Sequence, residues 1–583
     1  MIKTLAGSLR QYKKGSIITI GLSILEAAFE ILIPLCMADL IDKGIDLGDM
    51  TAVWKFGITI LIFAIFQLLT GMLSAHIAAK TAVGFSANLR QDMYDNVQTF
   101  AFSNIDKFST ASIVTRLTTD VTNIQNAYQM LIRMAIRGPV MLIFSMIVSF
   151  RINTMVSLIF LAVIFIMTLL LLLIIKKVNP IFNRVFHTYD KLNNIVQENV
   201  RGIRVVKSFN REDYEIHKFK GISQKIYEDF AAGERLLAFN SPIMQFFMYA
   251  CMILISWIGA KAIVASGNNG LLGMTTGDLT ALFSYATQIL MALMMLSMIF
   301  AMLTISIASA HRIAEILEEK TDIRNPELAQ TTVKDGSICF ENVDFVYASK
   351  ADKKVLNNIN LSIASGETVG IIGGTGSSKS SLVQLIPRLY DVTSGRLTLG
   401  GVDVRKYDLE VLRNAVAMVL QKNELFSGTI KENLLWGNEN ASEEEMIEAC
   451  RLACADEFIQ GFPDKYDTYI EQGGANVSGG QKQRLCIARA LLKRPKVLIL
   501  DDSTSAVDTK TDAAIQKSFA RFIPDTTKII IAQRVSSVQH ADQIIVLDDG
   551  RVVATGKHEE LLKTCAIYRE VYESQKKGDR NHE

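Results

Sequence analysis

Six long apolar stretches in the first half of this sequence restrict what the chain can fold into. Each is long and apolar enough to cross a bilayer as a helix. They occupy residues 16–41, 56–79, 131–150, 155–175, 243–264 and 279–307. An even number of spans places both ends of the chain on the same side of the membrane. We therefore predict an all-α membrane domain of six helices for this half.

The charges between the stretches predict which side that is. The two long connections, after the second and after the fourth stretch, are basic and contain Lys80, Arg90, Lys107, Arg116, Lys176, Lys177, Arg184, Arg201, Arg204 and Lys207. The short connections hold mainly Lys43, Lys55 and Arg151. Because basic connections stay in the cytoplasm, we predict a multi-pass plasma-membrane protein whose second half is cytoplasmic. The first stretch lacks a small-residue cleavage pattern, so we expect it to be retained as a span. The net charge of +2 gives nucleic acid no electrostatic footprint.

A glycine-rich segment in the second half is typical of a phosphate-binding loop. The apolar run 367–372 predicts a buried strand, and it leads into Gly373-Gly374-Thr375-Gly376-Ser377-Ser378-Lys379-Ser380, followed by Ser381 and a helical pattern. Small residues let successive backbone N–H groups converge on phosphates. We expect Lys379 to reach the β- and γ-phosphates and Ser380 to ligate Mg²⁺. The sequence therefore predicts a site for ATP and Mg²⁺.

Ser378 departs from the strict loop pattern, which has glycine at that position. If the position requires a positive φ, serine costs roughly 1–2 kcal/mol, a strain that a loop can survive.

Asp501 and Asp502 directly follow the apolar run 497–500, and their identities predict how well this chain hydrolyses a nucleotide. In a nucleotide hydrolase of this pattern, the first carboxylate holds Mg²⁺ through water and the next position carries a Glu that orients the attacking water. Here the second residue is Asp, which withdraws its carboxylate by about one C–C bond. A misplacement of ~1 Å can cost on the order of 100-fold in rate. We therefore expect this chain to bind ATP better than it hydrolyses it.

A further motif lies upstream of the aspartate pair and reads Asn476-Val477-Ser478-Gly479-Gly480-Gln481-Lys482-Gln483-Arg484. It resembles the signature of the ATP-binding cassette (ABC) family, and the resemblance extends over the whole chain. The family's other positions are matched by Tyr347, which would stack on adenine, Gln421, which would sense Mg²⁺, and Ser505-Ala506-Val507-Asp508, which would cross between cassettes. Taken singly, Tyr347 is also compatible with a packing role and Gln421 with an ordinary polar loop.

The resemblance implies that Ser478, Gly479, Gly480 and Gln481 face the γ-phosphate held by a second cassette. The resemblance also reveals a second residue that differs from the family pattern, because Gln533 occupies the position of the family's switch histidine. Glutamine donates a hydrogen bond but carries no charge and shuttles no proton. Glu471-Gln472 also differ from the family's usual Gly-Glu. An intact signature beside weakened hydrolytic residues Asp502 and Gln533 predicts a heterodimer, in which a different half-transporter supplies a catalytic Glu and a switch His. A homodimer stays the alternative.

The predicted architecture is a membrane domain at residues 1–317, a linker at 318–336, an α/β P-loop cassette at 337–575 and a polar tail at 576–583. By resemblance, this is the fold of a type I ABC exporter. Residues 109–117 resemble the first cytoplasmic coupling segment, and residues 202–209 lie just before the second. Such segments would dock on the cassettes near Gln421. Cys450 and Cys454, one helical turn apart, are expected to be reduced rather than a redox pair.

Substrate information should lie in the spans. Glu26 and Glu30 sit one turn apart in the first span, so they are candidates for a substrate pathway or for bonds to neighbouring helices. A stripe of methionines in the sixth span suits varied apolar ligands or ordinary packing: Met291, Met294, Met295, Met298 and Met302. We expect a multidrug-type exporter of hydrophobic or cationic compounds in contact with membrane lipid. A lipid or peptide exporter, an ATP-gated channel or regulatory subunit, and an uptake transporter of the same fold stay open.

Overall fold

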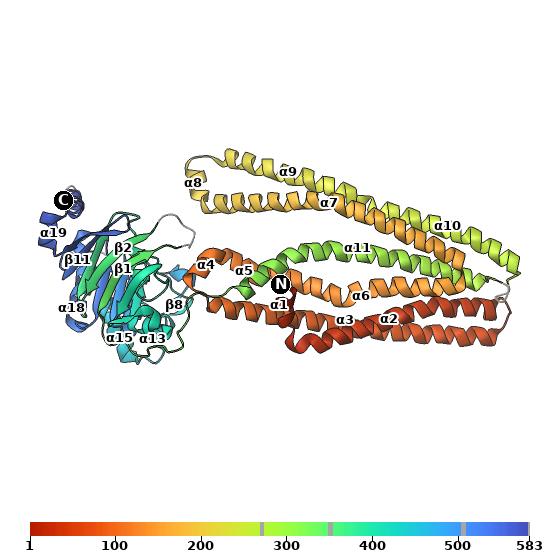
Figure 1. The fold of residues 1–583 in the computed structure, drawn as a ribbon, viewed down its shortest axis with the longest axis horizontal. Helices are drawn as coiled ribbons and strands as arrows, with labels where there is room; N and C mark the ends of the chain where they lie inside the picture. Colours follow the sequence, from red (N-terminus) through yellow and green to blue (C-terminus); the bar gives the residue numbers. More distant parts are fainter. Residues whose placement is uncertain (269–272, 348–353, 503–508, 581–583) are drawn as a thin grey trace. The chain divides into compact units, whose positions relative to one another are not determined.

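The computed structural model describes residues 1–268, 273–347, 354–502 and 509–580, and its chain divides into two compact units (Figure 1). The first, here called the helical unit, comprises Met1–Gln98 and Thr110–Glu319. The second, the sheet unit, comprises Thr99–Ser109 and Lys320–Glu583. The short insert Thr99–Ser109 therefore belongs to the sheet unit although it lies within the first half of the sequence.

Long helices make up the helical unit. They are α2 (Lys13–Leu40), α3 (Met50–Gln98), α6 (Val121–Ile152), α7 (Thr154–Arg201), α9 (Glu212–Ala238), α10 (Asn240–Ser266) and α11 (Thr276–Glu318). Shorter pieces join them: α1 (Ile2–Gly7), η1 (Arg10–Tyr12), η2 (Ile41–Ile45), α5 (Thr110–Thr115), η3 (Arg116–Asp120) and α8 (Ile203–Ser208). Their apolar composition suits a bilayer, where a helix satisfies every backbone polar group within itself.

Six of these helical segments are long and apolar enough to span a membrane, as the sequence predicted, within the described residues. They are Arg10–Ile45, Met50–Gln98, Thr110–Ile152, Thr154–Arg201, Glu212–Ser266 and Thr276–Phe300. Helix α3 has 49 residues and is therefore roughly 70 Å long, far more than the ~30 Å hydrocarbon core. The helices thus continue well beyond the bilayer, as the long basic connections indicated.

The packed core of the helical unit lies between α2, α6, α10 and α11. Ala27, Ile255 and Tyr285 are fully buried there. The Tyr285 hydroxyl donates to the carbonyl of Ile31 at 2.8 Å, so a phenol that would be costly to bury without a partner instead joins α11 to α2.

The sheet unit is built on a six-stranded sheet in the order β12-β11-β3-β10-β9-β6. Its strands are β3 (Thr368–Gly373), β6 (Val416–Val419), β9 (Val497–Asp501), β10 (Thr527–Ile531), β11 (Gln543–Asp548) and β12 (Arg551–Gly556). All neighbours pair in parallel except β11 and β12. Every residue of β9 and β10 is buried, which is why the runs 497–500 and 529–531 are apolar without alternation.

Smaller sheets complete the unit. One has the order β2-β1-β4-β5, from β1 (Ile338–Phe345), β2 (Leu356–Ile363), β4 (Ser394–Leu399) and β5 (Val402–Asp403), and the other pairs β7 (Gly428–Thr429) with β8 (Tyr469–Ile470). The helices are α4 (Phe102–Phe108), α12 (Lys379–Gln384), α13 (Leu409–Ala415), α14 (Ile430–Leu435), α15 (Glu443–Leu452), α16 (Asp456–Gln460), α17 (Gly479–Leu492), α18 (Thr509–Phe522), α19 (His558–Thr564) and α20 (Ala566–Arg580). The 3₁₀ turns are η4 (Val404–Lys406), η5 (Lys465–Asp467), η6 (Gln472–Gly474) and η7 (Val535–Ser537).

The register of the central strands positions the candidate site. Ile531 of β10 pairs with Ile371 of β3 and with Asp501 of β9. Because carboxyl ends of parallel strands meet at one edge of a sheet, the segments that follow these three strands are neighbours. These segments contain the phosphate loop, Asp502 and Gln533.

Helix α4 packs in the sheet unit, just before the predicted first coupling segment at residues 109–117. The sheet unit includes Thr99–Ser109, so it overlaps the predicted segment only at Ser109. The Tyr390 hydroxyl donates to Asp106 Oδ2 at 2.7 Å, and the Phe102 ring meets Tyr390 edge-on at 5.9 Å. The helix ends at Phe108, and Ser109 follows it with a φ of +49° before α5 begins. The coupling role of residues 109–117 stays a prediction.

Hydrogen bonds join the segment after α11 to other residues of the sheet unit. Asn325 bonds to the Asp408 carboxylate and to the backbone N–H of Leu409, and Gln330 N–H donates to Lys406 O. At the far end of the chain, α20 continues to Arg580 and so includes the first part of the predicted tail.

Candidate functional site

The phosphate loop connects β3 to α12 and has the backbone that such a loop requires. A Cβ on Gly373 would lie 2.2 Å from Leu547 O, so only glycine fits there. Gly376 has a φ of +82° and Ser378 a φ of +71°. The position of Ser378 therefore does require a positive φ. Glycine would adopt this left-handed conformation without penalty, whereas serine is strained in it.

Lys379 lies inside the curve of this loop. Its Nζ donates to Gly373 O and Gly374 O at 2.9 Å and to Ser377 Oγ at 3.2 Å. Burial lowers the pKa of Lys379, and the nearby charges of Asp501 and Asp502 oppose that shift. A half-buried ammonium in a ring of backbone dipoles is suited to attract a phosphate.

Two of the three residues predicted at the Mg²⁺ site, Ser380 and Asp501, lie together; the third is Gln421. Ser380 Oγ donates to Asp501 Oδ1 at 3.0 Å. Asp501 is buried, and this burial is the main reason why its pKa is raised; the charge of Asp502 acts in the same direction. The hydrogen bond from Ser380 and the charge of Lys379 lower the pKa but do not cancel the increase. Two hard oxygen donors beside a phosphate loop fit Mg²⁺, which takes one or two protein oxygens plus phosphate oxygens and water.

Asp502 is buried beside Asp501 and is held by two amides. Gln533 Nε2 donates to Asp502 Oδ2 at 2.7 Å, and Gln421 Nε2 donates to the same oxygen at 3.3 Å. The sequence singled out all three residues separately, and the structure brings them together. Gln421, predicted to sense Mg²⁺, thus contacts the second aspartate of the pair.

Gln575, on α20, was not found from the sequence. Its Nε2 donates to Gln533 O at 2.7 Å, and its Oε1 accepts from Val535 N at 2.9 Å. A glutamine near the end of a chain carries no signal of such a role, because the contact depends on how α20 folds back.

The Tyr347 side chain contacts three neighbouring side chains but stays partly exposed. Its hydroxyl lies 2.7 Å from Ser381 Oγ, and its ring meets Phe345 and Tyr390 edge-on at 4.8 and 5.1 Å. Nevertheless 44% of its surface is accessible, which leaves area for a stacked base. Tyr390 was also missed by the sequence, since nothing in its neighbourhood marks it.

The signature residues form an ordered helix start. Ser478 is the N-cap of α17: its Oγ accepts from Gln481 N at 3.3 Å, and Gln481 Oε1 accepts from Ser478 N at 2.9 Å. Gly479 and Gly480 form the first turn between them. Further along α17, Gln483 Nε2 donates to Asp502 O at 3.4 Å. The predicted crossing loop, Ser505-Ala506-Val507-Asp508, lies outside the described residues.

In the helical unit, both glutamates of the first span bond to a neighbouring helix. Arg137 of α6 pairs with Glu26 at 2.9 Å and with Glu30 at 2.5 Å. Arg137 was not predicted, because pairing across helices is not visible in sequence. Three methionines of the stripe, Met291, Met294 and Met298, are exposed in this single chain. Cys450 and Cys454 are not joined by a disulfide.

These features define a class: a P-loop nucleotide-binding unit of α/β fold joined to a helical unit with six membrane-length segments. Family models agree, since residues 16–318 match the ABC transporter transmembrane region and residues 356–505 match the ABC transporter domain.

Relatives span the chain. It is 37% identical to the uncharacterized ABC transporter ATP-binding protein YfiB of Bacillus subtilis (strain 168), over 97% of each chain. It is 34% identical to the uncharacterized ABC transporter ATP-binding protein Rv1273c of Mycobacterium tuberculosis (strain ATCC 25618 / H37Rv), covering 99% of this chain and 98% of the relative. The structure of a bacterial Atm1-family ABC exporter with ATP bound shares the fold, with a TM-score of 0.82, 22% identity and coverage of 97% and 99% of the two chains.

The chain belongs to the ABC transporter family. It shares the fold of an ABC exporter and is a multi-pass plasma-membrane half-transporter with a cytoplasmic ATP-hydrolysing cassette.

Proposed function

We propose that this chain is one half of a heterodimeric exporter of hydrophobic or cationic compounds. Its own ATP site, with a degenerate hydrolytic set, holds nucleotide, and its signature serves the partner's site. The observation that carries the proposal is at the Asp502 carboxylate, where two glutamine amides donate to the same oxygen, Oδ2.

The chemistry of that cluster favours retention over hydrolysis. A carboxylate that orients an attacking water must offer an oxygen to it. Here Oδ2 already accepts two hydrogen bonds, and the arm is one methylene shorter than that of glutamate. Gln533 keeps the amide as a donor, yet it cannot take up a proton as histidine does.

The contacts of the predicted nucleotide-binding residues support retention of ATP. Lys379 would bind phosphate, Tyr347 would stack on the base, and Ser380 with Asp501 would hold Mg²⁺. When bound, the metal ion would neutralise charge between the phosphates. The chain's residues bind and orient the nucleotide, and burial of Asp501 and Asp502 keeps the carboxylates away from bulk water.

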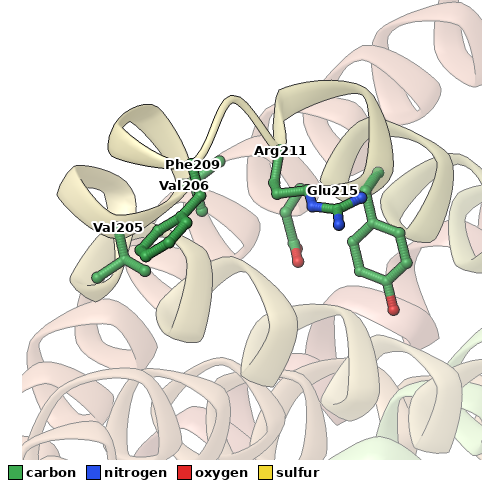
Figure 2. A pocket seen from close by; sticks show the side chains of 6 residues that line it. Val205, Val206, Phe209, Arg211 and Glu215 are labelled. Atoms are coloured by element: carbon green, nitrogen blue, oxygen red, sulfur yellow. The ribbon is translucent and has the colours of Figure 1, made fainter.

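Two apolar surfaces support pairing with a second half-transporter. On the helical unit, α8 and the start of α9 form a surface pocket of about 560 Å³ lined by Val205, Val206, Phe209, Arg211, Tyr214 and Glu215 (Figure 2). On the sheet unit, a groove of about 340 Å³ is lined by residues on both sides of Gln421 in the sequence, with Leu420, Phe426 and Trp436 among them. Exposed apolar surface of this kind marks interaction sites, and we assign both to coupling contacts with the partner.

The decisive experiment measures ATP turnover of the purified chain alone and after co-expression with a cassette half-transporter encoded beside it. We expect negligible turnover alone and robust turnover of the pair. In the pair, Asp502→Asn should change turnover less than about twofold. Vigorous turnover by the chain alone, lost on Asp502→Asn, would refute the proposal and establish a homodimeric pump.

Glu30 offers a test of the substrate class. We expect Glu30→Gln to weaken binding of a cationic probe such as tetraphenylphosphonium by several-fold, because Glu26, Glu30 and Arg137 together carry one net negative charge and the substitution removes it. A neutral probe of similar size serves as control. Unchanged binding of both compounds would contradict a cationic pathway and favour the lipid or peptide alternative.

A further inference from the structure

The loop that carries Gln533 needs an external support. Gln533 follows β10 and precedes the turn η7, so it lies where the chain has left the sheet ladder. Its side chain nevertheless reaches Asp502 at 2.7 Å. A hydrogen bond of that length persists only if the main chain that bears it is held in place, since each freed residue gains conformational entropy.

Gln575 supplies that support with one side chain. A primary amide has one carbonyl acceptor and an NH₂ donor. The oxygen of Gln575 accepts from Val535 N at 2.9 Å, and its nitrogen donates to Gln533 O at 2.7 Å. The two bonds fasten the main chain on both sides of Arg534. Exchanging the oxygen and nitrogen would set donor against donor and acceptor against acceptor, so the network fixes the orientation.

The helix that bears Gln575 is itself anchored. Tyr568 is fully buried, and its hydroxyl lies 2.7 Å from His558 Nδ1. Val571 and Tyr572 pack against the same hydrophobic core that includes Val535. Residues 568, 571, 572 and 575 share one face of α20 by helical spacing, so this face presents Gln575 to the loop at the end of its apolar stripe.

We propose that Gln575 is a positioning residue for the ATP site: through the main chain of residues 533–535 it keeps the Gln533 amide on Asp502 and thereby prolongs nucleotide retention. The effect on retention rests on the proposed function of this site, whereas the effect on the loop does not. The C-terminal helix is in this way part of the nucleotide site.

The test compares three full-length chains: wild type, Gln575→Met and Ser574→Ala. Methionine keeps the length and helix propensity of glutamine but makes neither bond. Ser574 is the exposed neighbour on the same helix and serves as the matched control. Hydrogen–deuterium exchange of the peptide containing Val535 reads out the loop directly. Thermal unfolding identifies any general loss of folding.

We expect faster exchange at Val535 in Gln575→Met, by about threefold to tenfold, the range for a lost hydrogen bond. Release of a fluorescent ATP analogue should accelerate by a similar factor. Ser574→Ala should match wild type in both measurements. Unchanged exchange in Gln575→Met, or equal acceleration in Ser574→Ala, would overturn the positioning role. Faster exchange with unchanged release would overturn the link to retention, and vigorous turnover of the chain alone would separately refute the retentive site.

Discussion

The start of α17 and the cluster around Asp502 are two regions of the cassette with predicted roles in hydrolysis, and they differ in how their polar groups are hydrogen-bonded. Ser478 and Gln481 satisfy each other's backbone at an exposed helix start, which leaves the first turn open to a ligand. Asp502 is buried and bonded by Gln421 and Gln533. The contrast supports the proposal that the signature and the hydrolytic residues are separate side chains, so that one set can weaken while the other stays intact.

The largest effect should come from damaging the signature. Ser478→Arg places a bulky cation at the start of α17 and removes the N-cap, so turnover of the heterodimer should fall by about 100-fold, as when an anion-stabilising donor is removed. Ser478→Thr, which preserves the cap, is the control. The measurement is steady-state phosphate release by the pair. Turnover that survives Ser478→Arg would mean that the signature serves no active site.

Restoring the hydrolytic residues should have the next largest effect. Asp502→Glu combined with Gln533→His returns the longer arm and the imidazole, and we expect this chain's own site to gain on the order of 10- to 100-fold in turnover. Phosphate release is measured in a pair whose partner carries Gln in place of its catalytic Glu. Asp502→Glu alone is the control. No gain from the double change would place the defect elsewhere, for example at Ser378.

The raised pKa of Asp501 predicts a pH dependence on the binding side. Burial favours the protonated carboxyl, whereas Mg²⁺ requires the carboxylate, so the two compete. Mg²⁺-dependent nucleotide affinity should therefore fall on acidification, by up to about tenfold per pH unit below the pKa, and the fall should begin above the range of an ordinary Asp.

Fluorescent nucleotide titrations in wild type and Asp501→Asn measure this effect. The difference between the two curves removes the titration of the nucleotide itself. Parallel curves at all pH values would show that Asp501 does not take part in metal binding.

The smallest effect concerns Ser378. Its left-handed backbone costs roughly 1–2 kcal/mol, and glycine would relieve this cost but lose about 0.4–1 kcal/mol through the entropy of the unfolded chain. Ser378→Gly should therefore stabilise the cassette by about 0.5–1 kcal/mol and raise its Tm by about 1–4 °C. Thermal unfolding of the full chain tests it, with Ser377→Gly as control. A lower Tm in Ser378→Gly would show that the serine makes a compensating contact.

Local patterns account for what the sequence could predict. Long apolar runs require membrane helices, and the phosphate loop and signature are contiguous segments, so both were found. Asp502 and Gln533 were recognised as departures, but their hydrogen bond depends on the pairing of β9 with β10. Arg137, Tyr390 and Gln575 were missed because each acts through a partner far away in sequence.

The contacts of α4 within the sheet unit were missed for a related reason. They are made by Phe102 and Asp106 on a short helix that ends at Phe108, next to the predicted coupling segment at residues 109–117. A helix of seven residues has too few turns for a clear periodic signal.

Tyr390 has a consequence for how mutants of this transporter should be classified. Its hydroxyl contacts Asp106 on α4, and its ring contacts Tyr347, the residue placed for the base. We infer that the side chain predicted to stack on the base and the helix next to the predicted coupling segment share one aromatic neighbour, Tyr390. A substitution at Tyr347 or Tyr390 will shift the ATP dose–response curve and the number of substrate molecules moved per ATP together. Variants isolated as poor ATP binders will therefore include uncoupled pumps, and the two phenotypes separate only when transport stoichiometry is measured at saturating ATP.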